Sequence, residues 1–241
     1  MKGFVIGVSG GIDSALTSAL CSLTQKPVIV LNMPILQHEE QLKRAEEHIE
    51  WLKKKFNNVS SYEVSITDIF LKTGEIFPKE IQDEHTMANT RSRLRMIALY
   101  AFSTHCRMLV AGTGNKVEDF GVGFFTKYGD GGVDISPIAD LMKSEVYALA
   151  HELKIGPSIL AAAPVDGLWE DNRTDEQQIG ATYNEMEWAM RWLSNRGKSK
   201  SQKLSSRQKR VLEIFKRFNK VNAHKMKPIP VCVIPEKLKK G

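Results

Sequence analysis

Serine, glycine and aspartate residues between positions 7 and 14 form a pattern suited to binding phosphate. The segment Ser9-Gly10-Gly11-Ile12-Asp13-Ser14 follows a short apolar run and precedes helix-forming residues. Such a turn points backbone N–H groups at an anion, while its glycines allow close approach and its serines add hydroxyl donors. A carboxylate repels phosphate unless a cation lies between them, so we predict that Asp13 is a Mg²⁺ ligand. The turn lacks the lysine of a Walker P-loop. The alternative is an ordinary glycine-rich turn.

Two later segments carry charged residues that could complete this site. Glu118 follows an apolar run and the turn Gly112-Thr113-Gly114, so we expect it opposite Asp13, where it would complete the Mg²⁺ site. A glutamate after a strand is common, and the position alone is weak support. Lys143 begins a predicted helix, where a cation is disfavoured, so a phosphate partner would explain it. A solvated lysine is the alternative there.

The elements around these residues predict an α/β protein. Apolar runs predict buried parallel strands, and 3.6-residue periodicity predicts helices between them. This pattern favours a Rossmann-like three-layer α/β/α fold with a central parallel sheet and a helical C-terminal part. Met33 would then lie near the adenine of a bound nucleotide, although a core methionine is the usual alternative. The predicted strands are 4–8, 26–33, 61–66 and 107–111, and the predicted helices include 15–23, 38–57, 67–77, 86–102 and one starting near 141.

Two further segments carry candidate binding residues. The helix at 86–102 contains Arg91, Arg93 and Arg95, which alternate and so cannot share one face. At least one of them could turn toward an anion, and three surface arginines are the alternative. The segment 124–134 is too rich in glycine and polar residues for an interior helix, so we interpret it as a functional loop.

Composition indicates a globular protein with one domain across residues 1–241. The chain has 241 residues and a net charge of +6, which favours anionic ligands. Three widely spaced cysteines favour a reducing compartment, and we expect a cytoplasmic protein without a signal peptide or membrane contact. Residues 194–210 are predicted to be an exposed basic loop. They lack interleaved aromatic residues, so we do not expect nucleic acid as a partner.

Taken together, these motifs resemble those of ammonia-dependent NAD synthetases, a family of the ATP pyrophosphatase superfamily. The resemblance covers nearly the whole chain. It is carried by Ser9–Ser14, Asn89–Met96, Gly112–Thr113, Glu118, Gly123–Asp130, Asp134, Pro137, Lys143–Glu145, Gly167–Glu170, Thr174–Glu176 and His224–Lys225.

The resemblance implies a reaction and a set of site residues. The reaction is amidation of deamido-NAD by ammonia, driven by ATP through an NAD-adenylate, with release of AMP and pyrophosphate. Asp13 and Lys143 would be catalytic, and Asp13 and Glu118 would bind Mg²⁺. ATP would be bound by Gly7, Val8, Ser9, Gly10, Gly11, Ile12, Asp13, Ser14, Met33, Thr113, Lys143 and Val165. Deamido-NAD would be bound by Arg93, Lys127, Asp134, His224 and Lys225, the last two from a tail at 211–241 that closes over the site.

The resemblance also implies a homodimer with the substrate at its interface. The family usually has a helix before the first strand, whereas this sequence starts at Met1 just before it, so we expect dimer strength to differ. Val165 stands where the family usually has serine or threonine. One hydrogen bond is worth about 1 kcal/mol, so we expect weaker ATP binding.

Two other functions are compatible with parts of the sequence. A tRNA thiolase or another amidating synthetase shares the first loop, but paired catalytic cysteines are absent and the 124–134 loop favours NAD synthetase. An inactive nucleotide-binding or RNA-binding protein could use the basic segment 194–210. The presence of Asp13, Glu118 and Lys143 argues against it. No glutaminase motif is present, so free ammonia is the expected nitrogen donor, and a partner protein could deliver it.

Overall fold

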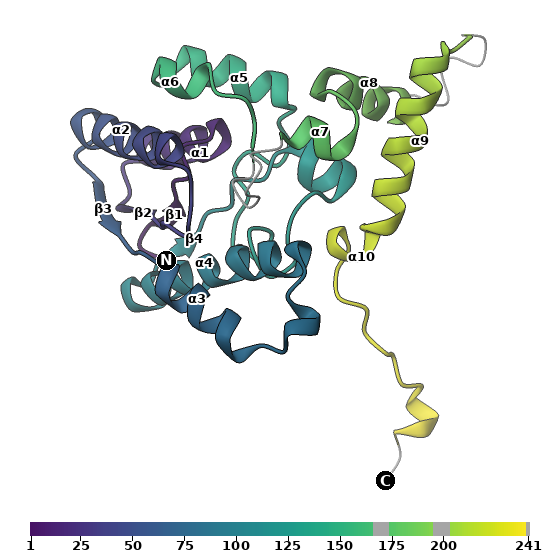
Figure 1. The fold of residues 1–241 in the computed structure, drawn as a ribbon, viewed down its shortest axis with the longest axis horizontal. Coiled ribbons are helices and arrows are strands. Elements are labelled where there is room, and N and C mark those ends of the chain that lie inside the picture. The colour runs from purple at the N-terminus through teal and green to yellow at the C-terminus, as the bar shows by residue number, and fades with distance from the viewer. Residues whose placement is uncertain (166–173, 195–202, 240–241) are drawn as a thin grey trace.

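A parallel β-sheet lies at the centre of the computed structural model, which describes residues 1–165, 174–194 and 203–239 (Figure 1). Among these residues, four strands pair in the order β3-β2-β1-β4. Phe4 of β1 lies opposite Val28 of β2 on one side and Leu109 of β4 on the other. The strands are β1 (Phe4–Gly7), β2 (Val28–Asn32), β3 (Val59–Glu63) and β4 (Leu109–Val110).

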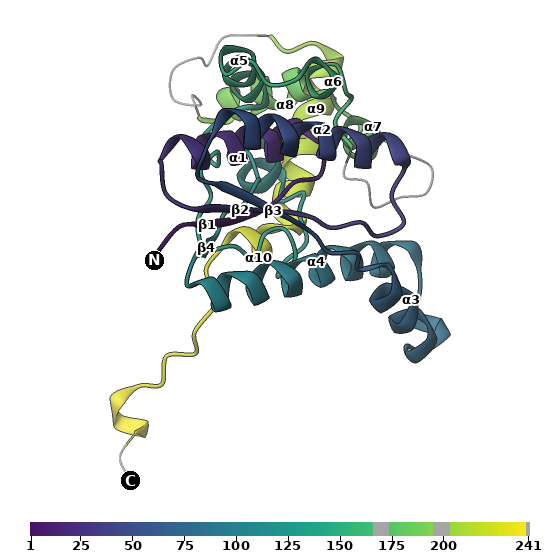
Figure 2. The same cartoon turned by 90° about the vertical axis from the view of Figure 1, so that its left-hand side faces the viewer.

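Helices cover both faces of this sheet (Figure 2). Alternate strand residues point to opposite sides, so Ile6 packs in one apolar cluster and Val5 in the other. Burial of each such side chain contributes about 1.5–3 kcal/mol. The predicted three-layer α/β/α class is therefore confirmed. One face carries α1 (Ile12–Leu23), α2 (Glu39–Lys55), α5 (Lys143–Glu152) and α6 (Pro157–Leu160), and the other carries α3 (Thr67–Ile76), the 3₁₀ turn η1 (Lys79–Ile81) and α4 (Glu84–Cys106).

The C-terminal part is helical and packs beside the sheet layer. A third apolar cluster joins it to a π-helix, η2, through Val117, Val122, Met186 and Phe215. This cluster anchors the later helices to the segment that follows β4. The elements are η2 (Lys116–Val122), α7 (Asp175–Ile179), α8 (Tyr183–Ser194), α9 (Ser206–Val221), α10 (Ala223–Met226) and the 3₁₀ turn η3 (Glu236–Leu238). Within the described ranges, no helix is long and apolar enough to cross a membrane.

Several element boundaries differ from the sequence predictions. The third strand begins two residues earlier than predicted and ends at Glu63, and the fourth contains two residues instead of five. The helical pattern that starts at Thr174 and runs through Ile179, Tyr183 and Met186 is interrupted, because Gly180 adopts φ +83° and ends α7. A left-handed glycine is a common helix stop. Short breaks of this kind leave the apolar periodicity intact, so periodicity alone did not reveal them.

The predicted basic loop at 194–210 is only partly within the structure. Residues 195–202 lie outside the described residues, and residues 206–210 belong to α9 rather than to a loop. The Ser205 hydroxyl accepts the N–H of Gln208 at 3.2 Å, and the Gln208 side chain accepts the Ser205 N–H at 2.9 Å. This capping box explains the error, because serine here starts a helix.

The segment predicted as a closing tail divides into three parts. Residues 211–221 form the packed second half of α9, and α10 lies against the 124–134 loop. Residues 227–239 lead away from the body of the molecule (Figure 1). Pro228, Pro230 and Pro235 lack backbone N–H groups, so this stretch cannot continue the helix.

The buried His48 generates a prediction for stability against pH. Its side chain lies between α1 and α2, 2% exposed, with Nε2 2.9 Å from the Ser18 hydroxyl and the ring stacked on Trp51. Burial lowers the pKa of His48 to about 4. The unfolded chain, with a histidine pKa of about 6.5, therefore takes up a proton at a higher pH than the folded chain. Stability should fall by roughly 2–3 kcal/mol between pH 7 and pH 4.5.

Urea unfolding at pH 7 and pH 4.5 would measure this loss. His48→Gln keeps an amide near Ser18 but cannot titrate, so its loss over the same range should be smaller. Equal losses in both proteins would show that other groups control the acid sensitivity.

Candidate active site at the carboxyl edge of the sheet

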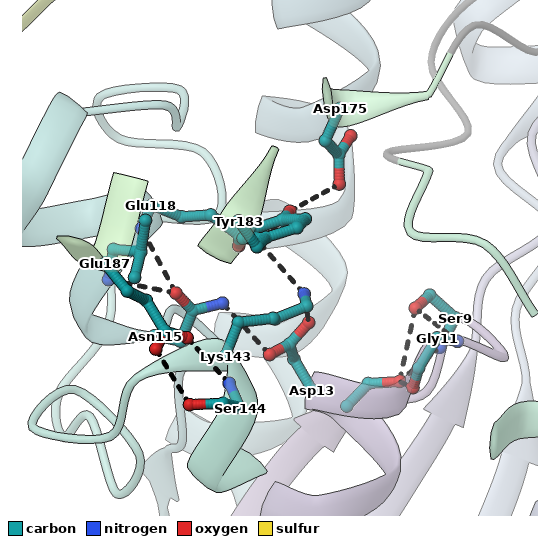
Figure 3. Close-up of polar contacts among 12 residues, drawn as sticks. Ser9, Gly11, Asp13, Asn115, Glu118, Lys143, Ser144, Asp175, Tyr183 and Glu187 are labelled. Carbon is teal, nitrogen blue, oxygen red and sulfur yellow. Dashed lines mark hydrogen bonds and ion pairs between the residues drawn. The ribbon is translucent and has the colours of Figure 1, made fainter. Parts of the chain in front are cut away.

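The glycine-serine turn after β1 is held rigidly by its own side chains. The Ser14 hydroxyl donates to the Gly11 carbonyl at 2.9 Å and accepts the Ser9 N–H at 3.2 Å (Figure 3). Gly10 adopts φ +80°, and a Cβ there would lie 2.5 Å from the carbonyl oxygen of Gln41 on α2. Only glycine fits this position. The first turn of α1 has no side-chain cap, so its N–H groups remain available to an anion.

A cavity of about 250 Å³ opens beside this turn. It lies where the carboxyl ends of β1 and β4 meet, at the edge where parallel α/β sheets bind ligands. All twelve residues predicted to bind ATP line it: Gly7, Val8, Ser9, Gly10, Gly11, Ile12, Asp13, Ser14, Met33, Thr113, Lys143 and Val165. The structure thus brings together residues from five separate segments of the chain.

A buried lysine bridges two carboxylates at the wall of the cavity. Lys143, 2% exposed, places its Nζ 2.6 Å from Asp13 Oδ2 and 2.9 Å from Glu118 Oε1 (Figure 3). Burial opposes the charge of this lysine, but Asp13 and Glu118 raise its pKa above the usual value. Burial likewise opposes the charge of Glu118, and the Lys143 ammonium lowers its pKa overall. Lys143 and Glu118 are therefore charged at neutral pH, whereas burial raises the pKa of Asp13 despite the lysine beside it.

Asn115 positions both carboxylates. This fully buried side chain donates through Nδ2 to Asp13 Oδ1 at 3.1 Å. Its Oδ1 accepts the N–H groups of Val117 and Glu118, both at 3.1 Å, which starts η2 and directs Glu118 toward the lysine. No motif in the sequence pointed to Asn115. Asparagine is a favoured N-cap residue, and its position just before the helical segment that follows β4 could have marked it.

Two residues of the C-terminal helices complete the surroundings of Lys143. The Tyr183 hydroxyl donates to Glu118, and its ring lies 4.7 Å from Lys143 Nζ. The buried Glu187 accepts the N–H and the hydroxyl of Ser144, each at 2.8 Å, and so fixes the start of α5. Both contacts join segments more than 40 residues apart. No local pattern in the sequence marks them.

The carboxylates of Asp13 and Glu118 provide a partial site for a hard cation. Within the described part of the chain, no three His, Cys, Asp or Glu side chains converge into a complete metal cage. Mg²⁺ is commonly held by one or two carboxylates together with substrate phosphates and water. The oxygen donors of Asp13 and Glu118 fit that pattern, and the phosphate-binding turn lies beside them.

The residues predicted to bind deamido-NAD lie outside this cavity. Arg93 donates to the Lys127 carbonyl at 3.3 Å, and Lys127 donates to the His224 carbonyl at 2.9 Å. Lys225 donates to the Phe125 carbonyl at 2.6 Å. These four basic residues therefore gather around the 124–134 loop. Asp134 is separate, because its Oδ2 accepts the Val110 N–H at 2.8 Å on the outer edge of β4.

Arg44 is a further cation at the cavity. It lies on α2 next to Gly10 and lines the cavity together with Gln41. Its buried Nε has no hydrogen-bond acceptor, and its ion pair with Glu40 is long at 4.0 Å. Glu40 is itself 92% exposed, so the pair is weak. A guanidinium in this setting is suited to a phosphate.

Comparisons with known proteins identify the family. The model of the NAD synthase family matches residues 1–229. The chain belongs to this family. The NH(3)-dependent NAD(+) synthetase of Mycoplasma genitalium is 38% identical over 188 residues, 77% of this chain and 73% of that protein. The enzyme of the same name from Carboxydothermus hydrogenoformans is 34% identical over 234 residues, 95% of this chain and 88% of that protein.

Solved structures agree with this assignment. The NMN synthetase of Francisella tularensis has a TM-score of 0.80 and 33% identity, with 98% of this chain and 90% of that chain covered. The NH3-dependent NAD synthetase of Campylobacter jejuni has a TM-score of 0.76 and 27% identity, with 96% and 90% covered. The predicted resemblance to NAD synthetases is confirmed.

Lys143→Met tests the electrostatic role of the buried lysine. The change leaves two partly buried carboxylates without their cation, which should lower the free energy of unfolding by about 3 kcal/mol, the low end of the range for buried pairs. Mg²⁺ should restore part of this loss, so calorimetry should show a larger Mg²⁺-dependent rise in Tm for the variant than for the parent.

Lys116→Met is the matched control. Its pair with Asp140 is exposed, so this change should alter stability by less than about 1 kcal/mol. Equal destabilisation by the two variants, or no added effect of Mg²⁺ on Lys143→Met, would contradict the electrostatic role.

Arg44→Gln tests whether α2 contributes to phosphate binding. A hydrogen bond to a charged group is worth about 1.5–3 kcal/mol, so loss of the guanidinium should raise the KM for ATP at least tenfold. The KM for the other substrates should change little. Steady-state kinetics would measure both values, with the exposed Lys43→Gln on the same helix as control. Equal effects at positions 43 and 44 would exclude a local contact.

Proposed function

We propose that this chain catalyses the ATP-dependent amidation of deamido-NAD with ammonia to give NAD. The supporting observation is the Asp13–Lys143–Glu118 cluster beside a phosphate-binding turn, in a chain of the NAD synthase family. We place the reaction in the cytoplasm, because the three cysteines are free thiols.

The chemistry requires activation of a poor electrophile. A nicotinate carboxylate oxygen attacks the α-phosphorus of ATP, and the bond to the β-phosphate oxygen breaks to release pyrophosphate. Ammonia then attacks the carbonyl carbon of the adenylate, loses one proton, and the carbon–oxygen bond to AMP breaks. No side chain has to form a covalent bond. The protein must position two anions and offset their repulsion.

The cavity residues would perform this task. The N–H groups of residues 9–14 would bind phosphate oxygens, and Lys143 would neutralise charge as pyrophosphate leaves. Asp13 and Glu118 would hold Mg²⁺, which supplies further charge neutralisation when bound. Met33 would contact the adenine, and Thr113 and Val165 line the same cavity. The Asp13–Lys143 contact at 2.6 Å keeps the lysine beside the phosphate turn until ATP competes for it.

The basic residues around the 124–134 loop would bind deamido-NAD. Arg93, Lys127, His224 and Lys225 supply cations for the substrate's phosphates and nicotinate. Asp134 would act by holding the outer edge of β4, since its carboxylate already accepts the Val110 N–H and the Tyr100 hydroxyl. The contacts that Arg93 and Lys127 make are exposed to solvent, and a bound substrate there would need a cover. A second copy would supply that cover, so we propose a homodimer.

The first test measures NAD formation from deamido-NAD and Mg-ATP, with ammonium in one tube and glutamine in another. We expect NAD with ammonium only, and Asp13→Ala should reduce turnover by at least a hundredfold while the fold is retained. Pyrophosphate release without NAD would point to another acyl acceptor. Salt-sensitive RNA retention without any ATP turnover would favour the nucleic-acid-binding alternative.

A second substrate is supported by one of the structural comparisons. The Francisella tularensis neighbour is an NMN synthetase, which differs in the nucleotide that carries the pyridine ring. Nicotinate mononucleotide should therefore be tested in parallel. A kcat/KM for the mononucleotide above that for deamido-NAD would transfer the proposal to that substrate, with the same adenylation chemistry.

Val165→Thr tests whether a hydroxyl at this position of the cavity strengthens ATP binding. Val165 lines the cavity without a hydroxyl. Restoring one hydrogen bond should lower the KM for ATP about fivefold, which corresponds to about 1 kcal/mol. Val165→Ala, which offers no hydroxyl, is the control. A KM that falls equally in both variants would indicate a steric effect.

A further inference from the structure

Tyr183, the first residue of α8, joins the C-terminal helices to the charged cluster at the cavity. Its side chain is 8% exposed, and its ring lies 4.7 Å from Lys143 Nζ. The hydroxyl contacts two carboxylates, Glu118 Oε1 and, at 3.1 Å, Asp175 Oδ2 (Figure 3). A phenol carries a single proton and donates to one acceptor at a time, and the contact with Glu118 is the shorter one. The proton therefore lies toward Glu118.

The phenol is suited to orient Glu118 because it is neutral. Lys143 and Tyr183 reach the same oxygen, Oε1, so neither of these bonds uses Oε2. A metal cation held by Asp13 and Glu118 would repel the ammonium of Lys143, which weakens the hold of the lysine on Oε1. The phenol has no charge and can keep its bond while the metal is present. Hydrogen bonds of this kind fix the orientation of a ligating carboxylate toward its metal.

The short helix α7 fixes Tyr183 from two directions. The carboxylate of Asp175 meets the phenol, and Glu176 accepts the Tyr183 N–H through Oε1 at 2.8 Å. The N–H of Asp175 in turn donates to the carbonyl of Pro164 at 3.2 Å, and Pro164 lines the cavity. A continuous set of hydrogen bonds therefore runs from this part of the cavity lining through α7 and Tyr183 to Glu118.

We propose that Tyr183 is a positioning residue for the metal: its hydroxyl holds Glu118 in the orientation that binds Mg²⁺, and α7 ties that orientation to the cavity lining at Pro164. Contact of ATP with this lining and binding of Mg²⁺ at Glu118 are thereby coupled. Tyr183 acts through Glu118 and does not touch the substrates in this role. The inference rests on the proposed function only for the assignment of Mg²⁺ to Asp13 and Glu118.

Tyr183→Phe tests this role because it removes the hydroxyl and keeps the ring beside Lys143. Mn²⁺, which also prefers oxygen ligands, is titrated into protein mixed with less than one equivalent of α,β-methylene-ATP. This analogue cannot release pyrophosphate, so electron paramagnetic resonance of free Mn²⁺ gives the Kd without turnover. Partners of ligating side chains are worth about 10- to 100-fold in metal affinity, so the Kd should rise at least tenfold. Tyr147→Phe, which alters a half-buried phenol on α5, is the matched control and should leave the Kd unchanged.

Glu176→Ala tests the connection through α7. Among the described residues, Glu176 lies outside the cavity lining, and it contacts Tyr183 through the backbone N–H. An effect on Mn²⁺ binding must therefore pass through Tyr183, and we expect a smaller rise of the Kd, about threefold. Glu185 accepts the Thr182 N–H at 2.9 Å at the same end of α8. Glu185→Ala removes this comparable contact and should leave the Kd unchanged.

An unchanged Mn²⁺ Kd in Tyr183→Phe would overturn the proposal, because a merely structural role would lower the Tm without altering metal affinity. A double-mutant cycle adds Glu118→Gln. In that background Tyr183→Phe should have little further effect, and a full additional rise of the Kd would show that Tyr183 acts by another route. If Tyr183→Phe does not fold, Glu176→Ala decides, and a Kd equal to that of Glu185→Ala would exclude the connection. Absence of NAD formation would defeat the proposed function but leave the Mn²⁺ result intact, so the two failures are distinguishable.

Discussion

The contact of the Lys143 ammonium with the carboxylates of Asp13 and Glu118 is the interaction on which this site depends. The buried charge of Lys143 is tolerable only because two partly buried carboxylates lie within 3 Å of its ammonium. The three residues come from the turn after β1, the segment after β4 and the start of α5. The hydrophobic core must bring these segments together before the charges can pair. Packing of the sheet and assembly of the site are thus one cooperative event.

The residues around this contact hold its charged groups in place. Asn115 holds both carboxylates, Tyr183 donates to Glu118, and Glu187 fixes the backbone next to Lys143. These neighbours orient the charged groups before any ligand binds, which is how electrostatic sites avoid reorganisation during a reaction. The helix dipole disfavours a lysine at a helix N-terminus. At Lys143 the two carboxylates compensate this unfavourable interaction.

Local chemistry made much of the fold and the nucleotide cavity predictable from sequence. The glycine of the turn and the apolar runs of the buried strands are each recognisable from a few neighbouring residues. The phosphate turn and the α/β class could therefore be predicted. The length of β4 was not predictable, because only Leu109 and Val110 pair with β1 as strand residues, and Ala111 instead bridges Ile135 in a distant part of the chain. Ser205 looked like part of a loop and proved to be a helix cap. Tyr183 and Glu187 act across 65 and 43 residues, distances at which sequence patterns carry no information.

The wide separation of the charged groups has a consequence for synthesis on the ribosome. Lys143 follows Asp13 by 130 residues, so at about 5–20 residues per second the aspartate emerges roughly 7–26 seconds before its counter-ion. During that interval the nascent β1–α1–β2 unit must keep the Asp13 carboxylate hydrated. A nascent chain therefore presents the phosphate turn without the cation that balances it, and nucleotide can be retained only after α5 has left the exit tunnel and docked.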